Sequence, residues 1–190
     1  MSVIALRNIT TSARIPRVIK GNDILVLVRL ASVAPKSWTF RAVAESLGMD
    51  VAAVHRSVGR LSAATLLDAD RQVNRSNLEE FLLHGLRFIL PAELGPVGRG
   101  RPTAWGVEPL RSLLAESGEP PPVWPDPNGV SRGPQVEPIA GGVLKLADSD
   151  PELGVWFALL DAMRVGRVRD KELAANELRS RIWAPVESAS

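Results

Sequence analysis

The chain has 190 residues, enough for one large domain or two small ones, and its 45% hydrophobic and 23% charged residues are ordinary for a globular protein. It has no cysteine, which excludes a disulfide framework, thiol catalysis and a zinc site built on thiolates. The longest aliphatic run, Ile24 to Val28, is far shorter than the roughly 18 residues that a membrane span needs. The first twenty residues lack the apolar stretch of a secretory signal, so we expect a cytoplasmic protein with no membrane partner.

Charge is distributed unevenly about a formal net value of +2. Lys and Arg outnumber Asp and Glu by 15 to 9 over residues 1–111, whereas acids outnumber bases by 12 to 8 over residues 112–190. A basic first half favours a polyanion as its partner, and residues 1–20, which carry scattered arginines, are interpreted as a basic arm. The alternative explanation for the many arginines is a GC-rich genome, which encodes arginine at positions where other genomes encode lysine.

Three helices are predicted near the start of the chain. A nearly unbroken apolar run over 22–33 predicts a buried helix. Thr39 then caps a second helix over 40–47, and Gly48 ends it because glycine adopts the left-handed conformation of a tight helix exit. A third helix is predicted over 51–64, and its buried face would consist of Val51, Val54, Val58 and Leu61.

The following segment is predicted to hold a short hairpin and a fourth helix. Residues 66–67 and Val73 are short strand candidates on either side of a polar turn. The capping box over 76–79 predicts the start of a helix that runs to about Ile89. Residues 91–109 are rich in Pro and Gly and are interpreted as a structured loop or an irregular hairpin.

The segment over 40–61 meets the requirements of a helix-turn-helix. It has a small residue, Ala44, where two helices cross, a glycine at the turn, Gly48, and an apolar plug after it, Met49. With the preceding helix and the short hairpin, residues 22–76 resemble the winged helix-turn-helix of bacterial transcription regulators, particularly the MarR-like group. The resemblance implies that the second helix of the motif lies in the major groove of DNA.

Burying the inner stripe of that helix turns Ala52, Ala53, Arg56 and Arg60 outward, where arginine suits guanine edges or phosphate. Two features depart from the family, a helix-weakening Gly59 and the shortness of the hairpin. The structural alternative is a winged helix that binds protein instead of DNA. The predicted DNA-binding residues are Thr39, Ala52, Ala53, Arg56, Arg60, Arg71, Arg75, Arg99 and Arg101.

The last two of these arginines belong to the string Gly-Arg-Gly-Arg-Pro within residues 97–102. This string looks like the core of an AT-hook, in which extended arginines enter a narrow minor groove. Contact with backbone phosphates is a second interpretation, and a plain surface loop is a third.

The second half of the chain is predicted to consist of a connector and a helical hairpin. Residues 113–138 are interpreted as a stiff Pro-rich connector whose Trp124 packs on its own domain, in preference to a docking ligand for another protein. Residues 139–185 are interpreted as two helices that form a dimerisation or packing unit, and a contact between subunits is favoured over packing within the chain. The subunit contact is favoured because the first of these helices has an apolar face that two helices alone do not bury. This face consists of Leu153, Trp156, Phe157, Leu160 and Met163.

Motifs of catalysis are missing from the sequence. His55 and His84 lie on different predicted helices without metal-binding spacing, and there is neither a nucleophile elbow nor a phosphate-binding lysine loop. We therefore expect no enzyme, no cofactor and no metal.

The predicted fold is mainly α with a small β wing, namely a winged helix-turn-helix domain over 21–112 followed by the C-terminal helical hairpin. The predicted function is a sequence-specific, homodimeric transcription regulator that binds double-stranded DNA and is associated with the nucleoid. The alternative is a winged-helix interaction module, antitoxin-like or part of a defence system, whose acidic C-terminal half binds a protein partner.

Overall fold

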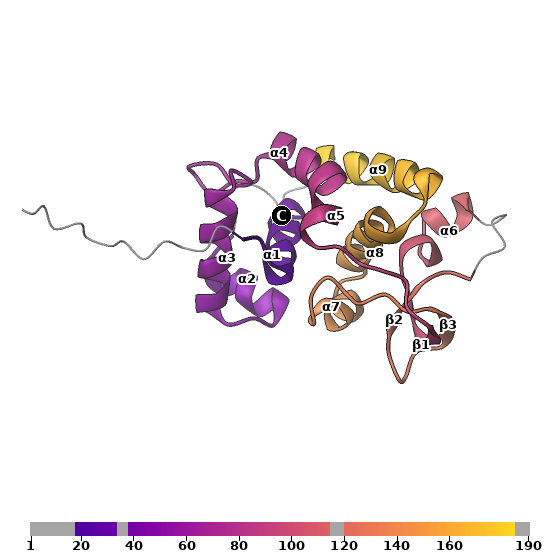
Figure 1. Ribbon diagram of the computed structural model, residues 1–190. Coiled ribbons are helices and arrows are strands. Elements are labelled where there is room, and N and C mark those ends of the chain that lie inside the picture. The colour runs from indigo at the N-terminus through magenta and orange to yellow at the C-terminus, as the bar shows by residue number, and fades with distance from the viewer. Residues whose placement is uncertain (1–17, 34–37, 115–119, 185–190) are drawn as a thin grey trace, which may run out of the picture.

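The computed structural model describes residues 18–33, 38–114 and 120–184, so almost all of the expected basic arm lies outside the described residues. The described chain is mostly helical, with a small three-stranded antiparallel sheet (Figure 1). None of its described helices is long and apolar enough to cross a membrane.

The three helices predicted near the start of the chain are present and pack on one another: α1 (Gly21–Ala31), α2 (Phe40–Leu47) and α3 (Val51–Ala63). The hydroxyl of Thr39 accepts a hydrogen bond from the Ala42 N–H (3.1 Å), as expected of a helix cap. Gly48 ends α2 with a φ of +60°, and Ala44 is buried between the helices. One expectation is wrong: Val51 is exposed, and Ser57 is buried on the inner face of α3 in addition to the predicted stripe.

The expected hairpin is reduced to one antiparallel bridge between Leu67 and Val73, because the turn between them occupies most of the segment. The fourth helix is continuous but contains a π-helical turn, and it is capped by Asn74, not by the predicted box at 76–79. Ile89, at the predicted end of this helix, is 45% exposed. The three parts of this helix are α4 (Arg75–Glu80), η1 (Phe81–Gly85) and α5 (Leu86–Ile89).

The sheet is formed by segments that the sequence predicts as a loop and a connector. Its central strand is β1 (Val97–Pro102), which pairs with β2 (Val123–Pro125) on one side and β3 (Ser131–Pro134) on the other. The Gly-Arg-Gly-Arg-Pro string is therefore a central strand, and a side chain at Gly100 would run into the backbone of Trp124. The sheet lies at the opposite end of the molecule from α3 (Figure 1).

Residues 120–138 are not an extended connector, because β2 and β3 fold back onto the protein. The expectation that Trp124 packs on its own chain is confirmed. Its side chain is buried, and its indole N–H donates to the carboxylate of Asp161 (2.5 Å). The segment between β1 and β2 adds two short helices, η2 (Ala104–Gly106) and α6 (Leu110–Leu113).

The C-terminal helical hairpin is present and is preceded by a helix that the sequence pattern did not predict. Asp150 caps the central helix through the Leu153 N–H (3.2 Å), directly before Pro151. The helices of this region are α7 (Val143–Ser149), α8 (Pro151–Val165) and α9 (Val168–Trp183).

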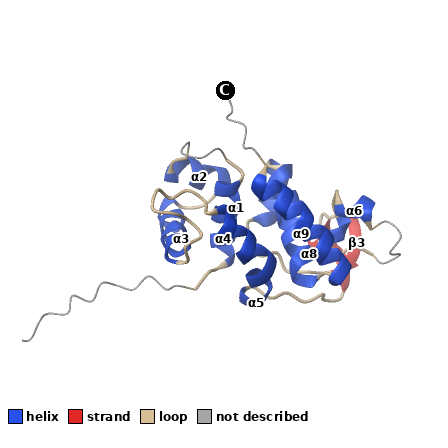
Figure 2. Ribbon diagram, turned by 90° about the horizontal axis from the view of Figure 1, so that it is seen from above, coloured by secondary structure: helices blue, strands red, loops and turns tan. Residues whose placement is uncertain are grey.

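Helix α8 lies at the centre of this half of the protein, in contact with α1, α5, α7 and α9 (Figure 2). All five residues of the apolar stripe assigned to a subunit contact are buried inside the chain. The favoured interpretation of that stripe as a dimer surface is therefore wrong, and its alternative, packing within the chain, is correct. The reason is that α1 and the sheet region supply the apolar partners that the hairpin lacks by itself.

Candidate nucleic-acid interface

Helix α3 lies along one edge of the molecule, and no other helix or strand of the described residues covers its outer side (Figures 1 and 2). Ala52 and Arg56 are exposed on this side, and Ala53 is half-buried beside them. The small side chains of Ala52 and Ala53 allow a binding partner to approach the helix backbone closely. Arg56 forms no ion pair within the described part of the chain, so its guanidinium is available to a ligand.

Arg60 does not belong to this outward face, contrary to expectation. Its Nε and Nη2 donate to the two carboxylate oxygens of Asp23 at 2.8 and 2.6 Å, and its side chain is only 11% exposed. Asp23 is fully buried at the start of α1, and the hydrogen bond to it raises the pKa of Arg60. The pair joins α1 to α3 and fixes the guanidinium of Arg60 at the side of the helix.

Three other predicted arginines are not brought to α3. Arg75, on α4, donates a hydrogen bond to the carbonyl of Ile182 near the end of α9 and so connects these two helices. Arg101, on β1, pairs with Asp126 after β2 and with Asp148 on α7. Arg99 is exposed on β1, at the far end of the molecule from α3. Arg75 and Arg101 are thus engaged within the chain, and Arg99 would need a separate surface to contact DNA.

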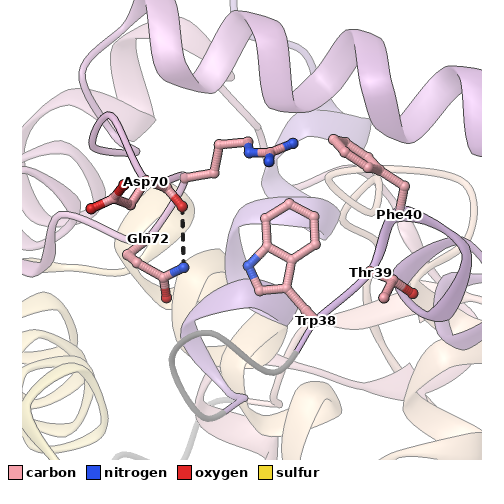
Figure 3. A pocket seen from close by; sticks show the side chains of 6 residues that line it. Trp38, Thr39, Phe40, Asp70 and Gln72 are labelled. Carbon is pink, nitrogen blue, oxygen red and sulfur yellow. Dashed lines mark hydrogen bonds between the residues drawn. The ribbon is translucent and has the colours of Figure 1, made fainter.

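The start of α2 and the turn of the hairpin enclose an open pocket of about 560 Å³ beside α3 (Figure 3). Trp38 and Phe40 line one side of it, and Asp70 and Gln72 line the other (Figure 3). Thr39 is exposed at its rim. The pocket has both aromatic and charged walls, which sequence reasoning did not anticipate.

A stack of three side chains connects this pocket to α3. The imidazole of His55 lies parallel to the ring of Phe40, with 3.5 Å between ring centroids and an interplanar angle of 13°. The guanidinium of Arg71 lies over the same ring at 5.4 Å. Arg71 is exposed, and this cation–π contact holds its guanidinium on the flank of α3.

On the opposite flank of α3 a second pocket, also about 560 Å³, lies against the start of α1. Its charged lining consists of Lys20, Arg56 and Arg60. The sequence analysis missed Lys20 because this residue stands in the predicted arm, and only the packing of α1 against α3 places it here. The outer face of α3 is thus flanked by cations on both sides.

The sheet region holds one further buried polar cluster, around Asp161 on α8. This carboxylate accepts hydrogen bonds from the Trp124 indole (2.5 Å), from the Thr103 hydroxyl (3.0 Å) and from Arg164 (2.7 Å). Burial raises the pKa of Asp161 despite these partners. Arg164 also donates to the carbonyls of Leu90, Pro91 and Glu137. The cluster thus joins α8 to β2 and to the segment that follows β1, and its hydrogen bonds give it a structural role.

No group of His, Cys, Asp or Glu side chains suited to a metal occurs among the described residues. Comparisons of the chain with protein-family models, with curated proteins and with solved structures found no match. The likeness to MarR-like regulators stays a prediction from the sequence, and the function below is argued from geometry.

Proposed function

We propose that the protein binds double-stranded DNA by placing α3 in the major groove. The observation that carries the proposal is the outer face of α3. There, small residues and Arg56, which has no ion pair with a described residue, lie between two cationic flanks. A helix of this kind fits the major groove, and flanking cations meet the phosphates on both sides of it.

The finer proposal is a winged helix-turn-helix regulator of transcription in the cytoplasm, associated with the nucleoid. It is supported by the arrangement of α1, α2 and α3, by the left-handed Gly48 at the turn and by the small bridge that follows α3. In this proposal Ala52 and Ala53 approach the bases, Arg56 reads guanine or phosphate, and Thr39 and Arg71 contact the backbone.

Two copies on two half-sites would add discrimination, since one helix contacts few base pairs. The apolar stripe of α8 is buried within the chain, so a dimer on DNA would have to use another surface.

The test is titration of the full-length protein into random-sequence duplex DNA at several salt concentrations, followed by selection of preferred sequences from a random pool. We expect binding whose logarithm falls linearly with the logarithm of salt, because cations that neutralise phosphates release counterions. An enriched sequence motif supports base reading by α3. Absence of binding at low salt contradicts the proposal and favours the interaction module that binds a protein partner through the acidic C-terminal half.

A further inference from the structure

The pocket between the start of α1 and α3 has the chemical character of an anion site. Lys20 and Arg56 line it, are exposed, and form no ion pair with any described residue. No carboxylate is among the described residues that line it, because Asp23 lies buried behind Arg60. The pocket therefore carries two uncompensated positive charges.

Arg60 also lines the pocket, and its guanidinium is only partly engaged by other described residues. Nε and Nη2 are engaged by Asp23, and Nη2 also reaches the Ser57 hydroxyl at 3.3 Å. Nη1 makes no hydrogen bond within the described residues, and Arg60 lines the pocket. A buried carboxylate that pairs with one edge of a guanidinium leaves the donors of the other edge available to an oxyanion.

Ser57 supplies an independent observation. Its side chain is 1% exposed, lines the pocket, and accepts the hydrogen bond from Arg60. No acceptor for its own hydroxyl hydrogen is found in the described part of the chain. A hydroxyl can donate as well as accept, so the Ser57 hydroxyl has a donor to offer to an acceptor that enters the pocket.

The backbone at the pocket adds hydrogen-bond donors, which also favour an anion. Gly21 and Asn22 open α1 and line the pocket, and the N–H groups of a first helical turn have no acceptor within the helix. The positive end of the helix dipole adds to the attraction of an anion.

We propose that this pocket binds a phosphate group through Lys20, Arg56, Arg60 and the hydroxyl of Ser57. The group is either a backbone phosphate of the DNA at the edge of the groove that α3 enters or the phosphate of a small molecule. The first source rests on the proposed function and the second does not.

The duplex arm of the test measures the salt dependence of random-duplex binding for the wild type, Lys20→Gln and Ser57→Ala. If a backbone phosphate occupies the pocket, Lys20→Gln lowers the magnitude of the salt slope by about 1, equally for every DNA sequence. Lys171→Gln, on α9, is the matched control and leaves the slope unchanged. Thermal melting of each variant shows that the fold is retained.

The free-phosphate arm titrates inorganic phosphate into full-length protein and follows amide signals by NMR, with sodium chloride at matched ionic strength as reference. Saturable shifts centred on Gly21, Asn22 and Ser57, weakened in both Lys20→Gln and Ser57→Ala, support a phosphate site. Shifts without any change in the duplex slope assign the site to a small molecule.

The two arms separate failure of this inference from failure of the proposed function. Duplex binding with an unchanged slope in Lys20→Gln, together with no saturable phosphate shift, overturns the phosphate site and leaves DNA binding standing. No duplex binding by the wild type, together with saturable phosphate shifts, overturns the DNA function and leaves the site standing.

Discussion

At the scale of single residues, two arginines one helical turn apart on α3 differ in their partners within the chain. Arg56 is exposed and unpaired, whereas Arg60 is held by a fully buried carboxylate. The sequence assigns both to one face because they are four positions apart. The difference arises from Asp23, which lies 37 positions earlier in the chain and attracts only the arginine nearer to α1.

We expect Arg56→Ala and Arg60→Ala to separate binding from stability. Arg56→Ala weakens binding to a preferred duplex by about 1–3 kcal/mol and leaves the melting temperature unchanged. Arg60→Ala leaves the buried Asp23 without its only described cationic partner and destabilises the fold by about 3–5 kcal/mol. Urea denaturation and duplex titration measure the two effects, with Arg132→Ala on the exposed side of β3 as a charge-matched control. Equal stability of the two variants would contradict the assignment of Arg60.

The cluster around Asp161 gives a second prediction at this scale. Asp161→Ala removes the acceptor of Trp124 and Thr103 and leaves Arg164, whose side chain is 5% exposed, without its carboxylate. We expect a loss of about 3–5 kcal/mol in the free energy of unfolding. The control is Asp148→Ala, which removes a carboxylate that is 63% exposed and should cost no more than about 1 kcal/mol. Comparable losses from both would show that the cluster does not stabilise the fold.

At the scale of elements, the turn between α2 and α3 depends on the backbone conformation of Gly48. Its φ of +60° lies in the left-handed region, and its N–H closes α2 on the carbonyls of Ala44 and Glu45. We expect Gly48→Ala to destabilise the protein by roughly 1–2 kcal/mol, because a side chain is strained in this conformation. Gly141→Ala is the matched control, since a Cβ there meets nothing within 4 Å. Chemical denaturation of both variants measures the difference, and a neutral Gly48→Ala would contradict the turn geometry.

The packing of α4 against α9 includes a contact that depends on pH. Glu79 accepts hydrogen bonds from the Trp183 indole (2.8 Å) and from Arg179 (2.9 Å), which together lower the pKa of this carboxyl. A carboxyl with a lowered pKa in the folded state stabilises the protein above its ordinary pKa, and this contribution is lost as the pH falls through the folded value.

We therefore expect Glu79→Gln to be less stable than the wild type at neutral pH and to have a lower melting temperature. The loss in the free energy of unfolding should be no more than about 1 kcal/mol, because the ion pair is largely exposed. Under acidic conditions the two proteins should be equally stable. Melting curves of both proteins over that pH range measure the effect. A difference that does not change with pH would show that the charge of Glu79 contributes nothing.

At the scale of the whole molecule, the two halves of the chain form one connected core. Helix α8 is buried nearly all round, and it contacts α1 of the first half as well as α7 and α9 of the second. A helix that is apolar on all sides requires partners on all sides, and the chain supplies them from both halves.

We expect a chain that ends at residue 137 to melt early or aggregate, because it loses α8 and exposes the apolar surface of α1. We also expect the full-length protein to sediment as a monomer in the absence of DNA, since the stripe assigned to a dimer is buried. Circular dichroism of the shortened chain and analytical ultracentrifugation of the full chain measure these outcomes. A folded, soluble shortened chain would contradict the role of α8 in the core.

The sequence by itself predicted several local elements of this protein, above all its first three helices. The helices over 21–31, 40–47 and 51–63, the cap at Thr39 and the exit at Gly48 follow from apolar periodicity and cap chemistry. These signals act between residues a few positions apart, so they can be read without knowing the rest of the fold.

Only the tertiary structure decided which polar residues are free to bind. Asp23 engages Arg60 from 37 positions away, and the Ile182 carbonyl engages Arg75 from 107 positions away. The Gly-Arg-Gly-Arg-Pro string became a central strand because β2 and β3 lie on both sides of it, and the stripe of α8 became core because α1 packs against it. The sequence alone could not decide this because burial and ion pairing depend on contacts between segments that are far apart in the chain. Short-range sequence patterns do not indicate which distant segments come into contact.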